Sequence, residues 1–362
     1  MGFQPSGSDR RCRLATDAAS AYTRDEIVFG HFVPNRVVGG HCMVKRPTID
    51  RDVVAPVVDG IHAVGGDVEA LLGDSCLLGE WSDPAVDLLP ESRVWKLFKL
   101  SAHGLDMPEI GLQAGSHLKI RDLGLFGNQL EQSLTLFHCL KEYISTVTYH
   151  SSHAEFWLDK RVGGVWFCRR GIDLITEGSQ YVEQFTVQLM TRLIQLATGP
   201  DWMPVRIRVQ SKTVRPYRYL EAFDSTELEC GHAATAVWIP SVELLRVVRN
   251  DNDDPMTQLI REAVSIGSEQ QRPSLVNTAN RLGFSKRTLQ RELSIQGLDW
   301  SRLLDQIRLQ RAIELLRSPN IKLGEVAYEL GYTDGANFGR AFRRWTGVTP
   351  RAYRLHLATA EL

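Results

Sequence analysis

The C-terminal part of this 362-residue chain carries the same local pattern twice, 48 positions apart. In each copy three apolar residues stand at positions i, i+4 and i+7, on one helical face, and a glycine follows the third. The first copy is Leu275, Ala279, Leu282 and Gly283, and the second is Leu323, Ala327, Leu330 and Gly331. The pattern predicts a short helix that ends at a glycine in the left-handed conformation.

Each glycine is followed by the signature of a second helix. Ser285 in the first copy, and Thr333 with Asp334 in the second, are residue types that cap helix N-termini. Apolar pairs spaced i, i+4 come next, namely Leu289 with Leu293 and Phe338 with Phe342. A helix, a glycine turn and a capped second helix form a helix-turn-helix unit. We therefore expect two such units, at about residues 274–294 and 322–346.

The second helix of each unit presents basic and polar side chains on its outward face. In the major groove of DNA, arginine can bind guanine through two hydrogen bonds, and glutamine can bind adenine in the same way. The alternative to DNA binding at each position is an ordinary solvated side chain, and at Arg344 this alternative is favoured. The candidate DNA-binding residues are Ser285, Lys286, Arg287, Gln290, Arg291, Asn337, Arg340, Arg343 and Arg344.

The segment that joins the two units, from Trp300 to Leu316, has a continuous helical pattern of apolar residues. At 1.5 Å per residue, this linker helix spans roughly 25 Å. Successive major-groove turns on one face of DNA lie about 34 Å apart. A helix of this length can hold two recognition helices near adjacent turns, within an all-α DNA-binding domain that we place at residues 257–356.

The charge of the chain is divided between its two parts. The formal net charge is −1, yet residues 270–362 hold 15 Lys and Arg against 8 Asp and Glu, a net charge of +7, and the remainder carries −8. Because Lys and Arg dominate affinity for nucleic acid by neutralising phosphates, the basic part suits double-stranded DNA as a partner. Charge alone is equally compatible with an ordinary solvated surface.

Helical and strand patterns alternate in the N-terminal part, which is therefore predicted to be α+β. The helical patterns cover residues 51–72, 92–103, 129–145 and 178–198, and the strand patterns cover residues 147–175, 205–209 and 233–239. Residues 1–25 lack an apolar core and are predicted to be disordered. Residues 250–256 read as a linker, since Asn250 to Pro255 contains no apolar residue. An effector-sensing and dimerisation domain is thus expected at residues 26–249.

The sequence contains no motif of an enzyme or of a metal site. The six cysteines are scattered without a Cys-x-x-Cys pair, which argues against a zinc ribbon, a disulfide framework and an alkyl-transfer repair enzyme fused to DNA-binding helices. His150, His153 and Glu155 lie in a predicted strand or turn rather than on one helical face, which favours a structural or surface role over a metal site. We expect no catalytic residue, no cofactor, no metal and no membrane span, and a cytoplasmic location.

The C-terminal segment resembles the AraC/XylS family of transcription regulators. The resemblance runs from Leu275 to Arg354, and its most specific stretch is Phe338-Gly-Arg-Ala-Phe-Arg-Arg-Trp-Thr-Gly-Val-Thr-Pro350. The N-terminal part, roughly from Val53 to Leu245, is similar to the arabinose-binding-domain subgroup of that family. The residues that carry this second resemblance include Leu123-Gly-Leu-Phe-Gly127 and Val237-Trp-Ile-Pro240.

The resemblance implies a sequence-specific DNA-binding regulator that is not an enzyme. It further implies an activator that contacts RNA polymerase, responds to a small-molecule effector in the N-terminal domain, and forms a homodimer through that domain. A regulator without an effector, whose N-terminal domain only dimerises, remains the alternative. The sequence discloses neither the effector nor the residues that bind it.

The chain departs from the family in its second recognition helix. Where family members often carry polar base-contacting side chains, this chain has Gly335, Ala336 and Gly339. Small residues permit close approach to DNA but read few bases. We therefore hypothesise that Arg287, Gln290 and Arg291 carry most base specificity, whereas Arg340 and its neighbours mainly bind phosphate.

Overall fold

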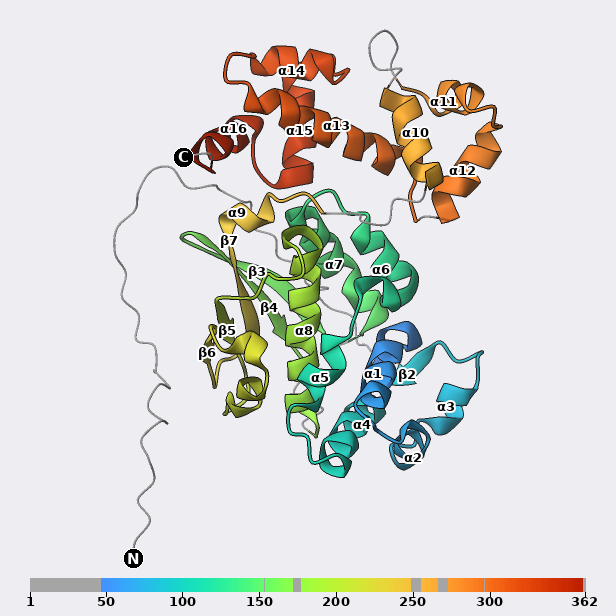
Figure 1. Ribbon diagram of the computed structural model, residues 1–362, viewed down its shortest axis with the longest axis vertical. Coiled ribbons are helices and arrows are strands. Elements are labelled where there is room, and N and C mark those ends of the chain that lie inside the picture. The colour runs from blue at the N-terminus through green and yellow to red at the C-terminus, as the bar shows by residue number, and fades with distance from the viewer. Residues whose placement is uncertain are drawn as a thin grey trace, which may run out of the picture.

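The computed structural model describes residues 47–152, 154–171, 177–248, 255–265, 273–295 and 297–360. The predicted disordered segment 1–25 and residues 250–254 of the predicted linker lie outside these ranges. An N-terminal body of helices and strands carries the C-terminal helices on one of its ends (Figure 1). The expected fold class, an α+β domain followed by an all-α domain with two helix-turn-helix units, is confirmed.

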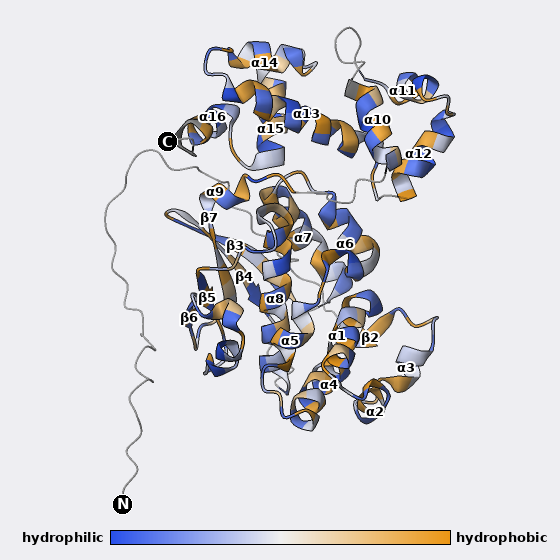
Figure 2. Ribbon diagram, in the orientation of Figure 1, coloured by the Kyte–Doolittle hydropathy of each residue, from blue (hydrophilic) through white to orange (hydrophobic). Residues whose placement is uncertain are grey.

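The first part of the body is mainly helical, with two short strands that pair in antiparallel fashion. Its elements are β1 (Thr48–Asp50), α1 (Arg51–Ala63), α2 (Val68–Asp74), α3 (Leu78–Ser82), β2 (Leu88–Pro90), α4 (Glu91–Gly104), α5 (Ile110–Ser116), η1 (Ile120–Leu123), α6 (Gly124–Glu131) and α7 (Leu136–His150). Figure 2 colours most of these helices in both blue and orange stretches, as expected where one face is buried and the other is solvated.

The second part of the body contains a five-stranded sheet in the order β3-β4-β7-β5-β6. Its elements are β3 (Glu155–Arg161), β4 (Gly164–Arg170), α8 (Ser179–Thr198), β5 (Arg206–Arg208), η2 (Arg215–Tyr219), η3 (Glu221–Phe223), β6 (Glu227–Glu229), β7 (Thr235–Pro240) and α9 (Ser241–Leu244). All neighbouring strands are antiparallel except β5 and β6. Helix α8 lies between the sheet and the helical layer of α1, α4 and α5 (Figure 1).

Two predictions about the body were wrong around α7. The helix expected at residues 129–145 is two helices, because α6 ends at Glu131 and Thr135 caps a new one by accepting a hydrogen bond from the backbone N–H of His138. Residues 147–150, expected in a strand, form the last turn of α7. Tyr143 and Val147 are buried at helical spacing, so packing against the body overrides the strand preference of Val147.

His150 therefore belongs to a helix end rather than to a strand. Its ring Nδ1 lies 2.6 Å from a carboxylate oxygen of Asp50. The ring also stacks on Phe126, with 4.1 Å between the ring centroids. His153, which the sequence places beside His150 and Glu155, lies outside the described residues.

The C-terminal helices form the two predicted units and their surroundings. They are α10 (Pro255–Ser265), α11 (Leu275–Arg281), α12 (Lys286–Ile295), α13 (Trp300–Arg317), α14 (Leu323–Glu329), α15 (Gly335–Thr346) and α16 (Pro350–Ala360). Helices α11 and α12 make the first unit, α14 and α15 make the second, and α13 joins them. None of the helices in the described part of the chain is long and apolar enough to cross a membrane.

The two helix-turn-helix units differ in the core to which they belong. The first unit has a small core of its own, built around Ile260, Leu289, Leu293 and Leu303. The buried residues of the second unit are continuous with the core of the body; they include Val326, Phe338, Phe342 and Trp345, and Tyr353 of α16 belongs to the same core. The second unit is thus packed onto the N-terminal body, whereas the first unit shares a separate small core with α10 and the start of α13.

Candidate nucleic-acid interface

The turn that precedes α12 has the conformation that the sequence predicts. Gly283 has a φ angle of +70°, a left-handed value that glycine adopts without a clash. The Ser285 hydroxyl accepts a hydrogen bond from the backbone N–H of Thr288 at 3.1 Å and so caps α12. Leu289 and Leu293 are buried, which sets the rotation of the helix about its axis and turns its opposite face outward.

The outward face of α12 brings five candidate residues together. All five are exposed to solvent: Ser285, Lys286, Arg287, Gln290 and Arg291. The Arg291 guanidinium lies 3.0 Å from the carboxylate of Glu292, but 72% of the Arg291 side chain is exposed. A surface pair of this kind contributes only about 0–1 kcal/mol, so Arg291 can exchange this partner for a base or a phosphate.

Helix α15 is capped by Asp334 rather than by Thr333. The Asp334 carboxylate accepts a hydrogen bond from the backbone N–H of Asn337 at 2.7 Å, and a second one from the Asn337 side-chain amide at 2.6 Å. The Asn337 carbonyl oxygen accepts a hydrogen bond from Arg340 in turn. Asp334, Asn337 and Arg340 therefore form a chain of hydrogen bonds along the first two turns of the helix.

The last two candidates on α15 are directed toward other parts of the protein. Arg344 donates a hydrogen bond to the carboxylate of Asp305 on α13 at 2.8 Å. Arg343 lies close enough to Lys160 on β3 to contribute to the lowering of the Lys160 pKa, in which burial is the larger cause. The structure thus gathers Asn337 and Arg340 at the start of α15 and places Arg343 and Arg344 toward the body and the linker helix.

The junction between the body and the DNA-binding helices was not anticipated from the sequence. The Thr135 hydroxyl donates a hydrogen bond to the backbone carbonyl of Trp345 at 2.5 Å. Arg302 on α13 contacts both carboxylate oxygens of Glu142 on α7, each at 2.5 Å. The partners are 210 and 160 positions apart, so no local sequence spacing could have indicated these contacts.

A crevice of about 560 Å³ opens at this junction, between α7 and α13. Its lining includes His138, Lys141 and Glu142 from α7, and Arg302 from α13. Burial lowers the pKa of His138, and the nearby Glu142 carboxylate only partly opposes this shift. The crevice is therefore lined by charged groups from both domains, and contacts across the junction influence the protonation of His138.

The body also contains a smaller, largely apolar cavity. Its volume is about 70 Å³, and residues from α1, α4, α7, α8 and β4 line it. Tyr143 of α7 is one of these residues, and it directly follows Glu142, which contacts Arg302. Helix α7 thus touches the cavity of the body as well as the DNA-binding helices.

Two family models match most of the described chain. The arabinose-binding domain of AraC transcription regulators matches residues 65–246, half of the sequence, and a helix-turn-helix domain model matches residues 278–356. This chain belongs to the AraC/XylS family. It is a DNA-binding transcription regulator of the helix-turn-helix type and not an enzyme.

Some relatives of this AraC/XylS regulator match it over most of its length, and others match only a segment of about 80 residues. An uncharacterized HTH-type transcriptional regulator of Mycobacterium tuberculosis is 24% identical over 336 residues, which is 86% of this chain and 96% of the relative. The ornithine utilization regulator of Pseudomonas aeruginosa is 42% identical over 82 residues, which is 23% of this chain and 24% of the relative. The crystal structure of the transcriptional regulator CdpR from Pseudomonas aeruginosa aligns with a TM-score of 0.38 and 21% identity, over 79% of this chain and 97% of that one.

Proposed function

We propose that this AraC/XylS regulator is an activator in which α12 reads bases, α15 anchors the protein on phosphate, and an effector bound in the N-terminal body controls the arrangement. The observation that carries the proposal is the difference between the two units. The first unit has its own small core and exposes a polar face, whereas the second unit shares its core with the body.

The composition of α12 supports base reading. Arg287, Gln290 and Arg291 are exposed on the helix that follows the glycine turn. In a helix-turn-helix unit this second helix enters the major groove and contacts base edges with its N-terminal residues. Each well-formed bidentate contact discriminates against a wrong base by about 1–3 kcal/mol. Three such side chains on one helix suffice to read a short half-site.

The composition of α15 supports an anchoring role. A Cβ atom at Gly335 or Gly339 would meet nothing within 4 Å, so packing inside the protein does not require these glycines. Glycine inside a helix costs about 1 kcal/mol relative to alanine. Glycine at these positions lets another molecule come close to the backbone of α15. The sugar-phosphate backbone of DNA is a surface that would do so. Arg340, held by Asn337, then binds phosphate at the same place.

The contacts of α7 support control by an effector. Tyr143 lines the cavity of the body, while Thr135 and Glu142 on the same helix contact the DNA-binding helices. A molecule that fills the cavity can therefore favour one position of α7, and with it one placement of the two units. As part of the same proposal, the protein acts in the cytoplasm, forms a homodimer through its body and contacts RNA polymerase.

The proposal is tested with the full-length chain and a DNA site selected from random sequence. Binding to the selected duplex should be at least about a thousandfold tighter than binding to a scrambled duplex at the same salt concentration. Adding the protein to RNA polymerase and a template with this site should raise transcript yield. A preference below tenfold would contradict sequence-specific reading, and a fall in transcript yield would contradict activation. If no extract of small metabolites changed the affinity for DNA, the effector-independent alternative would stand.

A further inference from the structure

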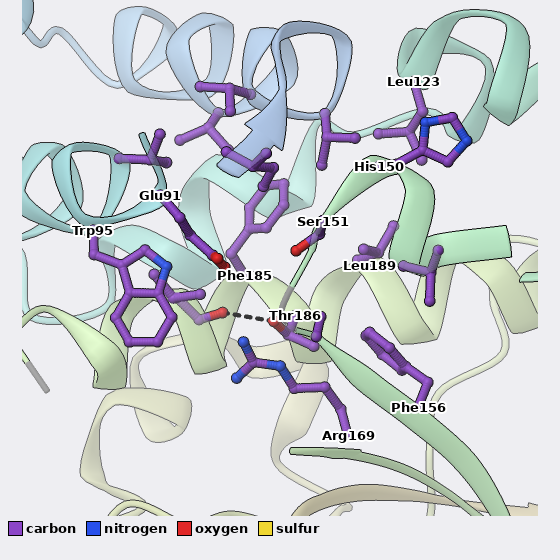
Figure 3. Close-up of a pocket in the computed structure, with 18 of the residues that line it drawn as sticks. Glu91, Trp95, Leu123, His150, Ser151, Phe156, Arg169, Phe185, Thr186 and Leu189 are labelled. Carbon is purple, nitrogen blue, oxygen red and sulfur yellow. Dashed lines mark hydrogen bonds between the residues drawn. The ribbon is translucent and has the colours of Figure 1, made fainter. Parts of the chain in front are cut away.

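The small cavity in the body holds two buried groups of opposite charge. Arg169 on β4 is 5% exposed and Glu91 at the start of α4 is 4% exposed. Figure 3 shows both side chains directed into the cavity, from opposite sides. Most of the remaining lining is apolar and aromatic, and includes Trp95, Phe156 and Phe185.

Within the described part of the chain, Arg169 has no hydrogen bond and no direct ion pair. Glu91 and Glu183 act on it through their charge: they raise the pKa of Arg169, against a larger lowering by burial. Glu183 is already satisfied elsewhere, because it accepts hydrogen bonds from the backbone N–H groups of Gln210 and Ser211 and from the hydroxyl of Thr235. The guanidinium therefore lacks a direct partner.

Glu91 is in a similar position. One of its carboxylate oxygens is buried without a hydrogen-bond partner among the described residues. Burial raises the pKa of this carboxyl, and Arg169 and the Trp95 side chain only partly oppose the shift. A buried charge without a partner is costly, and it is retained in proteins mainly where it is paired or has a function. Two such groups facing one cavity indicate a ligand that supplies both partners.

We propose that this cavity binds a small amino acid as a zwitterion, with its carboxylate on Arg169 and its ammonium group on Glu91. The charge pattern decides between classes of ligand. A plain carboxylate would satisfy Arg169 but would face the like charge of Glu91, and a plain amine would face the like charge of Arg169. A zwitterion satisfies both groups and leaves the buried site electrically neutral.

The volume of the cavity limits the size of the ligand. An apolar cavity of roughly 150 Å³ holds benzene. The cavity here has about 70 Å³, which suits the smallest amino acids and makes any larger side chain displace the aromatic lining. We therefore expect glycine, L-alanine and β-alanine to bind, and leucine or phenylalanine not to bind.

This assignment rests on the proposed control of DNA binding by an effector, since it names the chemical class of that effector. Tyr143 connects the two, because it lines the cavity one residue after Glu142, which contacts Arg302. The amino acid would thus act on α7 at the point where the helix meets the DNA-binding domain.

The test is thermal unfolding of the full-length chain with glycine, L-alanine, β-alanine, acetate, propionate and methylamine, at matched ionic strength. At a hundredfold excess over the dissociation constant, at least one amino acid should raise the melting temperature by about 5 °C or more. The acids and the amine alone should change it by less than about 1 °C. An equal shift with acetate or propionate, or no shift with any amino acid, would overturn the proposal.

Two substitutions locate the binding site, and a third serves as the control. Glu91→Gln preserves size and removes the negative charge that pairs with the ammonium group, so most of the shift should be lost in a protein that still folds. Arg169→Met should abolish it as well. Arg170→Met changes the neighbouring exposed arginine, which pairs with Glu155 on the surface, and should keep the full shift. A full shift in Glu91→Gln would overturn the assignment.

Titration of the selected DNA duplex with the same wild-type samples separates this inference from the proposed function. Specific DNA binding without any response to amino acids would contradict only the ligand assignment. Loss of specific DNA binding itself would contradict the proposed function.

Discussion

The Arg302 guanidinium lies 2.5 Å from both carboxylate oxygens of Glu142, and this contact joins the linker helix α13 to helix α7 of the body. The two side chains are only 16% and 22% exposed. This ion pair fixes the linker helix on the N-terminal domain, and the hydrogen bond from Thr135 to the Trp345 carbonyl fixes the second helix-turn-helix unit there. The DNA-binding domain is therefore not carried on a free tether.

Arg302→Gln should destabilise this junction. The ion pair is partly buried, so removing it should cost more than removing a surface pair and less than removing a buried one. We expect the free energy of unfolding to fall by about 1–2 kcal/mol. Urea unfolding measures the loss. The control is Arg311→Gln on the same helix, whose exposed pair with Glu314 should contribute less than about 0.5 kcal/mol. Equal losses in the two variants would show that the Glu142 contact has no special role.

His138 should make stability depend on pH in the mildly acidic range. Burial lowers its pKa below the ordinary value of 6.5, so the unfolded chain takes up a proton at a higher pH than the folded chain does. The folded state is then fully favoured above about pH 6.5 and loses stability as the pH falls below that value. Glu142 opposes the shift, while Arg302, Lys141 and Arg344 add to it.

Urea unfolding at pH 7.5, 6.5 and 5.5 measures this dependence. His138→Gln should flatten the decrease below pH 6.5, whereas His103→Gln, at the exposed end of α4, should leave it unchanged. If the wild-type protein and His138→Gln lost stability in parallel, another group would be responsible.

Asp334→Ala should weaken α15 through the loss of its cap. The carboxylate accepts two hydrogen bonds from Asn337, and removal of an N-cap costs typically about 1 kcal/mol. Asp334→Asn retains a capping oxygen and should recover most of the loss. The same measurement on Thr333→Ala should show little change, because Thr333 does not cap the helix. If Thr333→Ala lost more stability than Asp334→Ala, Thr333 and not Asp334 would be the residue that caps α15.

Substitutions of Gly339 should change stability and DNA affinity in opposite directions. Because a Cβ atom there meets nothing within 4 Å, Gly339→Ala and Gly339→Leu should stabilise α15 by about 0.5–1 kcal/mol. Gly339→Leu should nevertheless lower DNA affinity about tenfold, which corresponds to 1.4 kcal/mol, by blocking close approach of the backbone. Unfolding and fluorescence anisotropy on the same samples test both effects. If the DNA affinity of Gly339→Leu were unchanged, α15 would not lie against the DNA at this residue.

The helix-turn-helix units could be predicted from the sequence because every signal that defines them is local. The glycine turn at Gly283, the cap at Ser285 and the buried pair Leu289 and Leu293 lie within about three turns of chain, and the structure contains each of them. The choice between Thr333 and Asp334 as the cap was not decided by sequence, since both residue types favour that position.

The body could be predicted only in outline. Val147 and Tyr149 are residue types typical of strands, so the sequence predicts a strand where the structure has the last turn of α7. Only the packing of Tyr143 and Val147 against distant elements makes this turn helical. Arg169 gave no signal either. An arginine near the end of a strand is expected at the surface, and nothing in its sequence neighbours shows that this one is buried and lines the same cavity as Glu91.

The central claim, that α12 reads bases while α15 anchors the protein, is tested most directly by base preference in two variants. Selection from random DNA with the wild-type chain, Arg291→Ala and Arg340→Ala gives the preference at each position of the site. Arg291→Ala should lose discrimination at one base pair by about 1–3 kcal/mol, and Arg340→Ala should weaken binding to all sequences alike and lower the salt dependence. If Arg340→Ala relaxed base preference more than Arg291→Ala did, the account would be contradicted.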